Sequence, residues 1–389
     1  MAPRALILDI TRLAARLDGR PMTGIDRVEA AYLREAMRRT APLLLIWRQA
    51  PFTMVLGAGA GAALRAVIDG QAAAAGLPQR LRSHALGRAM GPGLARLIRR
   101  HAPTGGDYLN VGHMNLRPRG LAQMRRAGLR VQVMIHDTIP LDFPQFQPPG
   151  SPARFRRRLL AALRGADRII ANSAATAADV SRWAARLGLA CPPVLTAPLG
   201  IDLAAPAALP AGLAADRPWF VATGTIEPRK NHALLLDSWG LLAARLPAAQ
   251  VPLLLILGRR GWAGAALMAR LDALPPDGPV LAWPGLDDGQ VAALTAGARA
   301  ALIPSWAEGF GLPAFEAAAR GTPILAAPLP ALAPLAGPGL TTLPPDDPAA
   351  WAEAVARATL APAPRPAPLD FPGWTDHVDL VLSGLPALG

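Results

Sequence analysis

Two glutamates that flank a glycine-rich loop are the residues of this sequence best suited to chemistry. Glu308 lies in the loop, and Glu316 lies about one turn into the helix that we expect to follow. The residues after Glu308 offer flexible backbone and N–H groups, and they are Gly309, Phe310, Gly311 and Leu312. A helix start attracts anions, and carboxylates beside an anion suit sugar hydroxyls better than a metal ion. Taken singly, Glu316 also fits an ordinary first-turn carboxylate, and Glu308 a helix cap.

A pair of cations follows another predicted strand in the same half of the chain. Arg229 and Lys230 come after the strand at residues 219–223, on the side of the sheet where ligands bind. Lys230 is the one lysine among 40 lysine and arginine residues, so this position is a candidate for needing a compact ammonium. An arginine fork and a lysine point charge stabilise a departing diphosphate without a divalent ion. The alternative is a pair of solvated surface cations.

The acidic residues do not form a cluster of the kind that holds a metal ion. Adjacent pairs occur at Asp287–Asp288 and Asp346–Asp347, and we expect both pairs in solvated turns. One cysteine, Cys191, excludes a disulfide framework and a cysteine-based zinc site. The sequence therefore predicts no cofactor and no divalent metal.

Two further candidates lie in the first half of the chain. His136 ends an apolar strand, where the active sites of open α/β sheets gather, although a core histidine has the same pattern. Gly24 and Ile25 follow the first predicted strand and open an amphipathic helix. Gly24 would leave room for phosphates or for an acceptor.

Together these segments resemble glycosyltransferase family 4, a family of retaining nucleotide-sugar transferases with the GT-B fold. Glu308, seven intervening residues and Glu316, within EGFGLPAFEAAARGTP, resemble the family's double-glutamate signature. TGTIEPRKNH (223–232) resembles its diphosphate-binding segment, and IHDTIP (135–140) resembles the segment with its donor-sugar histidine. TGIDR (23–27), PLGID (198–202) and LGRRGW (257–262) resemble other family loops, so the likeness covers nearly the whole chain.

The resemblance implies a role for each candidate. Glu308 would position donor hydroxyls, and Glu316 would bind the ribose. Arg229 and Lys230 would stabilise the diphosphate, and His136 would orient the sugar. The rest of the donor site would consist of Gly24, Ile25, Thr225, Gly309, Phe310, Gly311 and Leu312. Thr225 departs from the family, since many members carry an arginine there.

Composition and charge limit the class of protein. The 389 residues are 52% hydrophobic and 17% charged, and no apolar run has the ~18 residues of a membrane-spanning helix, so we expect a soluble, cytoplasmic protein without a signal peptide. Residues 1–200 carry 29 arginines and 11 acids, a net charge of +18. This half would contact an anionic inner membrane surface, or else be a solvated arginine-rich surface. Nucleic-acid binding is not expected, because stacking aromatics are not interleaved with the cations.

Alternation of strand-like and helix-like segments predicts an α/β protein. With the resemblance, it indicates a GT-B fold of two Rossmann-like domains that face each other across a cleft. The first domain (1–201) would bind the acceptor, and a linker (202–218) would lead to the nucleotide-sugar domain (219–365). Residues 366–389 would cross back to the first domain.

Two segments of the first half need separate predictions. Residues 81–101 read as one basic helix. Residues 57–62, GAGAGA, fit a dinucleotide-binding fingerprint, but no acid occurs between Asp69 and Asp107 to hold a ribose. We therefore expect 57–62 to be a flexible, alanine-rich segment.

The sequence thus predicts a metal-independent, retaining hexosyltransferase of cell-surface polysaccharide synthesis. Its partners would be a nucleotide-sugar donor and a glycan or lipid-linked acceptor. Among the donors, the resemblance favours GDP-mannose. One alternative is a phosphorolytic or nucleotide-sugar-processing enzyme of the same fold. The other is a degenerate GT-B protein that acts as a glycan-binding or scaffold module.

Overall fold

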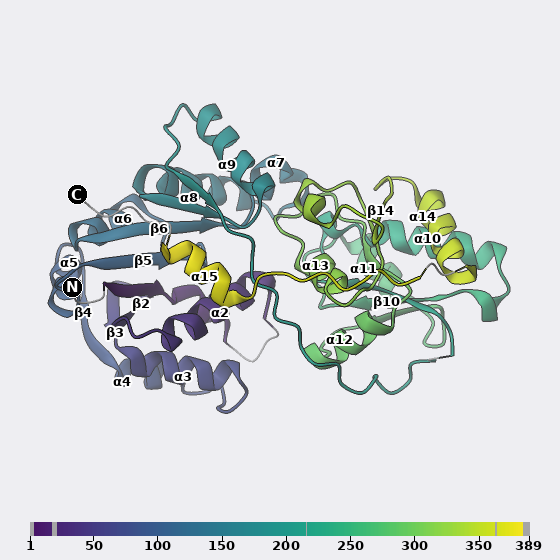
Figure 1. Ribbon diagram of the computed structural model, residues 1–389, viewed down its shortest axis with the longest axis horizontal. Helices are drawn as coiled ribbons and strands as arrows, with labels where there is room; N and C mark the ends of the chain where they lie inside the picture. The colour runs from purple at the N-terminus through teal and green to yellow at the C-terminus, as the bar shows by residue number, and fades with distance from the viewer. Residues whose placement is uncertain (1–3, 18–21, 215, 362–363, 384–389) are drawn as a thin grey trace. The chain divides into compact units, whose positions relative to one another are not determined.

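The computed structural model describes residues 4–17, 22–214, 216–361 and 364–383. The chain forms two compact units, each with its own sheet (Figure 1). The first unit comprises Met1–Asp142, Gly150–Gly200 and Pro372–Gly389, and the second comprises Phe143–Pro149 and Ile201–Phe371. Residues 202–218, predicted as a linker, group with the second unit. In the described ranges, no helix is both long and apolar enough to cross a membrane.

The first unit is built on an eight-stranded sheet with the order β4-β3-β2-β1-β5-β6-β7-β8. The pairs along β2-β1-β5-β6-β7-β8 are parallel, whereas β3 and β4 run antiparallel to their neighbours. The strands are β1 (Ala5–Asp9), β2 (Leu43–Gln49), β3 (Phe52–Leu56), β4 (Ala85–Ala89), β5 (Gly106–Asn110), β6 (Leu129–Ile135), β7 (Arg168–Ala171) and β8 (Val194–Thr196). Strands β1 and β5 are buried throughout, as expected for parallel strands with both faces covered.

Helices connect these strands and pack on the sheet. They are α1 (Thr11–Arg16), α2 (Gly24–Arg38), α3 (Ala58–Ile68), α4 (Leu77–Ser83), α5 (Gly93–His101), α6 (Pro118–Arg126), α7 (Ile139–Asp142), α8 (Ser151–Gly165) and α9 (Ala174–Arg186), with the short 3-10 turn η1 (Pro144–Phe146). The last helix, α15 (Trp374–Ser383), belongs to the first unit and packs against α2 (Figure 1). Its His377 accepts the Tyr32 hydroxyl at 2.8 Å through Nε2 and donates from Nδ1 to the Pro198 carbonyl at 2.7 Å.

The prediction of one helix over residues 81–101 is wrong. The segment contains the end of α4, the strand β4 and the helix α5. Gly91 has a φ of 49°, and Pro92 lies between it and Gly93, so a helix cannot continue there. Gly87 lets β4 approach α5, because a Cβ at this position would lie 2.9 Å from Leu97.

The prediction of a flexible segment at residues 57–62 is also wrong. Gly57 caps α3, and its alanines are good helix formers. Gly61 lets α3 lie close to α2, since a Cβ there would meet the Met37 sulfur at 3.1 Å. The repeated glycines therefore serve helix packing.

The second unit has a fully parallel six-stranded sheet with the order β11-β10-β9-β12-β13-β14. This is the order of a doubly wound Rossmann sheet: strands β9 to β11 extend the sheet to one side, and β12 to β14 extend it to the other, so the strand order reverses between β9 and β12. The strands are β9 (Trp219–Thr223), β10 (Leu253–Leu257), β11 (Val280–Trp283), β12 (Ala301–Ile303), β13 (Ile324–Ala326) and β14 (Leu340–Thr342).

The helices of the second unit complete its core. They are α10 (His232–Arg245), α11 (Ala265–Asp272), α12 (Asp288–Gly297), α13 (Leu312–Ala318) and α14 (Pro348–Leu360), with 3-10 turns η2 (Pro228–Lys230), η3 (Ala248–Gln250) and η4 (Pro330–Leu335). Phe220, Trp239 and Trp351 are fully buried among aliphatic residues of the sheet and of α10 and α14. The aspartate pairs that we expected in solvated turns begin two of these helices. Asp287 Oδ1 accepts from the Gln290 N–H at 2.7 Å, and Asp347 caps α14.

Candidate active site

Three predicted site residues of the second unit, Arg229, Lys230 and Glu308, lie together where the strand order of its sheet reverses, between β9 and β12. Arg229 and Lys230 lie in the turn after β9, and Glu308 lies in the loop after β12, the neighbouring strand. Ligands of doubly wound folds bind beyond the carboxyl ends of the strands at this reversal. The backbone joins the two loops directly, because the Trp306 N–H donates to the Arg229 carbonyl at 2.8 Å.

The side chains of these loops form a compact charge cluster, which we define as Glu227, Arg229, Lys230, Ser305 and Glu308. Lys230 Nζ donates to Glu308 Oε1 at 2.5 Å, and Arg229 Nη1 donates to Glu308 Oε2 at 2.9 Å. Arg229 Nε also lies 2.5 Å from Glu227 Oε1, and Ser305 Oγ donates to Glu308 Oε1 at 2.7 Å. The side chains of Glu227 and Glu308 are 5% and 6% exposed, so these contacts are largely shielded from water.

The pKa values of the two glutamates in the cluster are shifted in opposite directions. Burial raises the pKa of both, but Arg229 and Lys230 outweigh burial at Glu308 and lower its pKa to about 2. At Glu227, burial prevails over the same cations, and its pKa is raised. Glu308 is therefore ionised at neutral pH, whereas Glu227 takes up a proton more readily than an exposed glutamate does.

Local backbone features hold the cations in place. Asn231 has a φ of 55°, a left-handed conformation that asparagine tolerates, and it starts α10 directly after Lys230. Its Nδ2 donates to the carbonyls of Pro304 and Pro345 at 3.2 and 2.7 Å. Gly224, with a φ of 137°, passes close to Lys230, because a Cβ there would lie 3.6 Å from Nζ. Thr225 lies next in the same loop, against Gly261.

The loop from Gly309 to Leu312 is fixed by packing. Gly311 has a φ of 93° and caps α13, and a Cβ there would lie 2.7 Å from Leu332. The Phe310 ring is buried and stacks on Phe315, with centroids 4.3 Å apart, so only the backbone of Phe310 is left for a ligand. The helix α13 has seven residues and carries Pro313 in its first turn, where a proline is well tolerated.

Glu316 lies on α13, outside the five residues that define the charge cluster. Its side chain is half-buried, and its negative charge acts on Arg320. Burial lowers the pKa of Arg320, and Glu316 offsets only part of that shift. The sequence signature thus places its two glutamates in different surroundings. Glu308 is neutralised by Arg229 and Lys230, whereas Glu316 acts on Arg320, which is partly buried.

In the first unit, His136 lies directly after β6. Its Nε2 donates to the Val111 carbonyl at 2.7 Å, which leaves Nδ1 as the acceptor of the ring. Burial lowers the pKa of His136 to about 4, so the ring is neutral at pH 7. The centroid of the His113 ring lies 4.9 Å from that of His136. His113 has a left-handed backbone conformation, with a φ of 61°. A neutral ring of this tautomer accepts a hydrogen bond from a hydroxyl.

Gly24 and Ile25 form the first turn of α2, where Gly24 is exposed. Thr23 and Asp26 cap the helix, with the Thr23 N–H donating to Asp26 Oδ2 at 2.7 Å. Arg12 pairs with Asp26 and donates to Glu29 Oε2 at 3.0 Å. Burial raises the pKa of Glu29 to about 8, despite Arg12. This buried network fixes the helix start at which Gly24 lies.

Sequence reasoning missed several of these residues. Glu227 lies within the motif quoted around Arg229, but the sequence alone does not show that its side chain is buried. Asn231 follows Lys230, and only its positive φ reveals its bridging role. Arg12 and Glu29 come together because β1 is followed by the short helix α1 and then by α2. No group of three or more His, Cys, Asp or Glu side chains that could hold a metal ion occurs in the described ranges.

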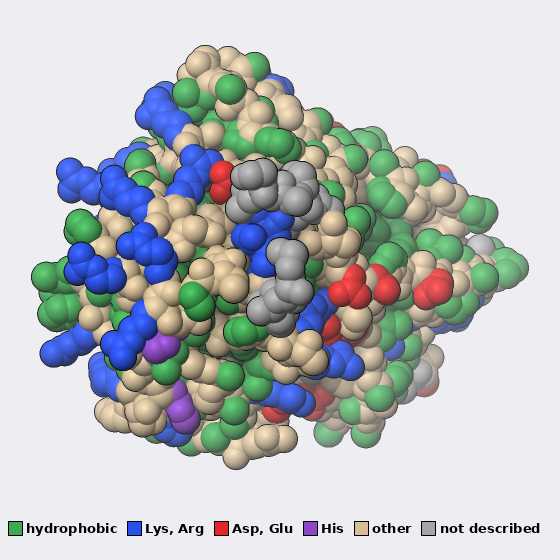
Figure 2. Space-filling model, turned by 60° about the vertical axis from the view of Figure 1, so that its left-hand side comes forward, with side chains coloured by type: hydrophobic (Ala, Val, Ile, Leu, Met, Phe, Trp, Pro, Cys, Tyr) green, Lys and Arg blue, Asp and Glu red, His purple; other side chains and the backbone are tan. Residues whose placement is uncertain are grey.

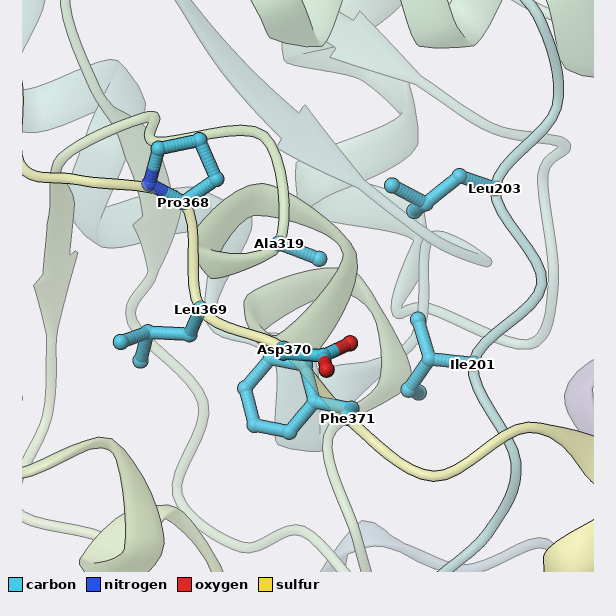
Figure 3. Close-up of a pocket in the computed structure, with 7 residues that line it drawn as sticks. All are labelled: Ile201, Leu203, Ala319, Pro368, Leu369, Asp370 and Phe371. Carbon is cyan, nitrogen blue, oxygen red and sulfur yellow. The ribbon is translucent and has the colours of Figure 1, made fainter.

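A separate pocket of about 260 Å³ lies in the second unit (Figure 3). Its lining contains none of the predicted site residues and consists of Ile201, Leu203, Ala319, Pro368, Leu369, Asp370 and Phe371. Among these described residues Asp370 is the one charged side chain, and the other walls are apolar. The Phe371 ring meets Phe315 edge-on, with centroids 5.2 Å apart, and so supports the stack behind the Gly309–Leu312 loop.

Comparison with known proteins identifies the family. Residues 217–359 match the model of "Glycosyl transferases group 1". The serotype-specific mannosyltransferase WbdA of Escherichia coli is 31% identical over 285 residues, which is 68% of this chain. The matched region covers 34% of WbdA, so the chain spans about a third of this relative.

Solved structures show the same fold over nearly the whole chain. Alr3699/HepE of Anabaena, solved with UDP and glucose, has a TM-score of 0.61 at 18% identity and covers 98% of this chain and all of its own. WaaG, a glycosyltransferase involved in lipopolysaccharide biosynthesis, has a TM-score of 0.58 at 14% identity and covers 98% of this chain and 95% of its own. The two Rossmann-like units are thus those of a GT-B protein. Residues 217–359 of the chain, in the second unit, belong to the glycosyl transferases group 1, which is glycosyltransferase family 4.

Proposed function

We propose that this protein is a retaining glycosyltransferase that moves a hexose from a nucleoside diphosphate sugar to a glycan or lipid-linked acceptor. The observation that carries the proposal is the buried charge cluster, which lies where the strand order of the second sheet reverses. A doubly wound sheet binds nucleotides at this place, and the cluster offers an ammonium, a guanidinium and an ionised carboxylate there. The family and the names of its relatives support sugar transfer in polysaccharide synthesis.

The residues divide the work as follows. Lys230 has three N–H donors, of which Glu308 takes one, and the others would meet the diphosphate. As the bond between the anomeric carbon and the diphosphate breaks, the leaving oxygen gains charge, which Arg229 and Lys230 stabilise. The acceptor oxygen bonds to the anomeric carbon on the same face, and its proton passes to the leaving phosphate oxygen. Glu308 would bind donor hydroxyls, Glu316 the ribose, and Gly24, Ile25, Thr225 and the Gly309–Leu312 loop would line the donor.

For the first unit we propose acceptor binding, and for His136 a hydrogen bond from a sugar hydroxyl to Nδ1. The neutral ring and its tautomer fit this role. We propose that the protein works at the cytoplasmic face of a membrane, where a lipid-linked acceptor is available. The arginines of the first unit support this location, and Figure 2 shows them spread over the face turned forward.

The donor is tested by a thermal-shift screen over GDP-, UDP-, ADP- and CMP-sugars. We propose mannose from GDP-mannose, because WbdA is named a mannosyltransferase, whereas the structure of HepE holds UDP. A ligand at ~100 times its dissociation constant stabilises a protein by roughly 2.7 kcal/mol, so the true donor should stand out. A shift with UDP-glucose alone would replace mannose by glucose in the proposal.

The reaction itself is tested by proton NMR of the product, which reports the anomeric configuration. We expect retention. No transfer and no donor hydrolysis with any shifting nucleotide sugar would favour a glycan-binding or scaffold protein. Transfer to inorganic phosphate would favour a phosphorolytic enzyme.

We also propose that turnover needs no divalent metal, since Arg229 and Lys230 supply the positive charge at the diphosphate. Transfer should continue in EDTA at the rate measured with Mg²⁺ or Mn²⁺. Turnover that stops in EDTA and returns with either ion would contradict this proposal.

A further inference from the structure

Four aromatic residues of the second unit lie together at the surface, and we call them the aromatic ledge: Phe143, Phe146, Trp262 and Trp306. The rings of Phe143 and Phe146 stack with centroids 6.1 Å apart, and Phe146 and Trp306 stack at the same spacing. Trp262 Nε1 donates to the Phe146 carbonyl at 3.1 Å. The chain has 19 aromatic residues (8 Phe, 9 Trp and 2 Tyr), so a group of four is a marked concentration.

The ledge does not belong to the hydrophobic core of the second unit. Trp262 is 44% exposed, and the other three side chains are half-buried. Phe220 and Trp239, by contrast, are fully buried in that core. Exposed rings that stack on one another contribute less to folding than buried ones, which indicates a ligand.

The ledge continues directly from the charge cluster. Trp306 lies in the same loop as Glu308 and next to Ser305. Its backbone N–H donates to the Arg229 carbonyl. A ring held on this ledge therefore lies beside the place where the sugar is to be transferred. The bond from Trp262 Nε1 to the Phe146 carbonyl ties this indole to the other rings of the ledge.

We infer that the aromatic ledge binds pyranose rings of a glycan acceptor by stacking against their apolar C–H faces, in addition to the acceptor contacts proposed for the first unit. This inference rests on the proposed function. The row of rings at 6.1 Å spacing is longer than one ring, which suits successive sugars of a glycan better than a single nucleobase. The indole of Trp262, which is 44% exposed, provides the main contact area. The occupant is thus a glycan of more than one sugar.

Trp262 is the residue to test, because it is the most exposed of the four and lies outside the charge cluster. Trp262→Ala should weaken binding of a neutral trisaccharide by about tenfold, whereas Trp262→Phe should keep most of it. We would measure binding by saturation-transfer NMR with trisaccharides of mannose, glucose and galactose. Leu360→Ala, which removes an exposed side chain elsewhere in the second unit, is the matched control and should change nothing.

The same variants separate the ledge from the proposed function. Binding of GDP and UDP should be equal in the parent and in Trp262→Ala, and transfer should show a raised KM for long acceptors at an unchanged kcat. A Trp262→Ala protein that loses nucleotide affinity would assign the ledge to the nucleobase and overturn the inference. So would a parent protein that binds none of the trisaccharides. Trisaccharide binding that depends on Trp262 in a protein without transferase activity would sustain the ledge and reject the proposed function.

Discussion

At the residue scale, the site is a set of charges that neutralise one another before any ligand arrives. Glu308 is ionised and holds Arg229 and Lys230, so the cations are positioned without a bound anion. Two ionised glutamates would balance both cations. Because burial raises the pKa of Glu227, a proton taken up there leaves the cluster positive, which would favour the diphosphate of the proposed donor.

Lys230 should contribute most as the diphosphate leaves. Lys230→Ala is expected to lower kcat by roughly 10²–10³ and to weaken nucleotide binding less, because the leaving group gains charge in the transition state. Lys230→Arg keeps the charge but replaces the compact ammonium, so its kcat should also fall. Steady-state kinetics and calorimetric titration with the nucleoside diphosphate measure the two effects.

The control for Lys230 is Arg270→Ala, which removes a cation from an exposed pair with Asp237. This variant should have the parent's kcat, since surface pairs contribute little. Parent-like turnover in Lys230→Ala would end the assignment. A lower melting temperature in the same variant is expected, because the lysine side chain is 13% exposed and bonded to Glu308.

Glu29 should make folding stability depend on pH. Its pKa is about 8 in the folded protein and about 4.5 when unfolded, because burial outweighs Arg12, with Asp26 and Asp9 adding negative charge. The stabilising effect is full below pH ~4.5 and is lost as the pH rises to ~8. The loss is about 1.4 kcal/mol per pH unit in this window.

Glu29→Gln keeps the shape of the protonated side chain and should remove this loss. Urea unfolding at pH 6 and pH 8 would show a smaller drop in the variant than in the parent. Glu353→Gln, which removes an exposed carboxylate paired with Arg357, should leave the drop as it is. Equal drops in the parent and in Glu29→Gln would disprove the role of this carboxyl.

At the element scale, the site depends on loops that only unusual backbone conformations can form. The turn after β9 needs Gly224, and the Gly258 loop after β10 passes so near that a Cβ there would lie 1.9 Å from the Gly224 carbonyl oxygen. The loop after β12 needs Gly311 in the left-handed region. These positions bring three strand ends close enough to act on one ligand.

Gly311→Ala should destabilise the protein by about 1–3 kcal/mol and weaken donor binding. Two causes act, since alanine disfavours a φ of 93° and its Cβ would lie 2.7 Å from Leu332. Adding Leu332→Ala removes the clash but not the backbone strain, so it should restore donor affinity only in part. Thermal unfolding and nucleotide titration measure both.

Gly240→Ala is the matched control for Gly311→Ala. Gly240 lies in α10 with an ordinary φ, and an added Cβ would have no atom of the described residues within 4 Å beyond its own helix backbone. Alanine there should stabilise the protein by about 0.5–1 kcal/mol. If Gly311→Ala behaved in the same way, the left-handed conformation would have no role in the site.

At the scale of the whole molecule, charge separates the two halves of the chain. Residues 201–389 carry 10 arginines, one lysine and 16 acids, a net charge of −5 against +18 for residues 1–200. Residues 70–106 contain six arginines and no acid. Leu86 and Met90, at or beside the edge strand β4, are 42% and 54% exposed in this region. Cations around exposed apolar side chains are suited to an anionic lipid surface.

The protein should therefore float with vesicles that contain phosphatidylglycerol, and the bound fraction should fall with salt. Arg96→Glu with Arg100→Glu, on α5, should reduce the bound fraction strongly. Arg245→Glu with Arg299→Glu changes the net charge equally in the second unit and should have a weaker effect. Equal binding to neutral phosphatidylcholine vesicles would refute the electrostatic contact.

The sequence by itself determined the fold class and the positions of most elements. Buried parallel strands are continuous apolar runs, and the strand predicted at residues 219–223 agrees to the residue with β9. The signature around Glu308 and the cations after β9 also stand in the sequence, because ligand loops follow strand ends. Residues 81–101 show the limit, since an exposed edge strand pairs with β3 through contacts that local periodicity does not contain.

Only the tertiary structure decided which charges meet. Arg229 and Glu308 are 79 residues apart, and they pair because β12 lies beside β9 in the sheet. Burial then sets the pKa of Glu227 and Glu308 in opposite directions, which depends on the depth of each side chain and on its neighbours. The ledge of Phe146 and Trp306 is decided in the same way, by the packing of segments that are distant in sequence. Sequence specifies the residue types and local elements, whereas the sheet order decides their neighbours.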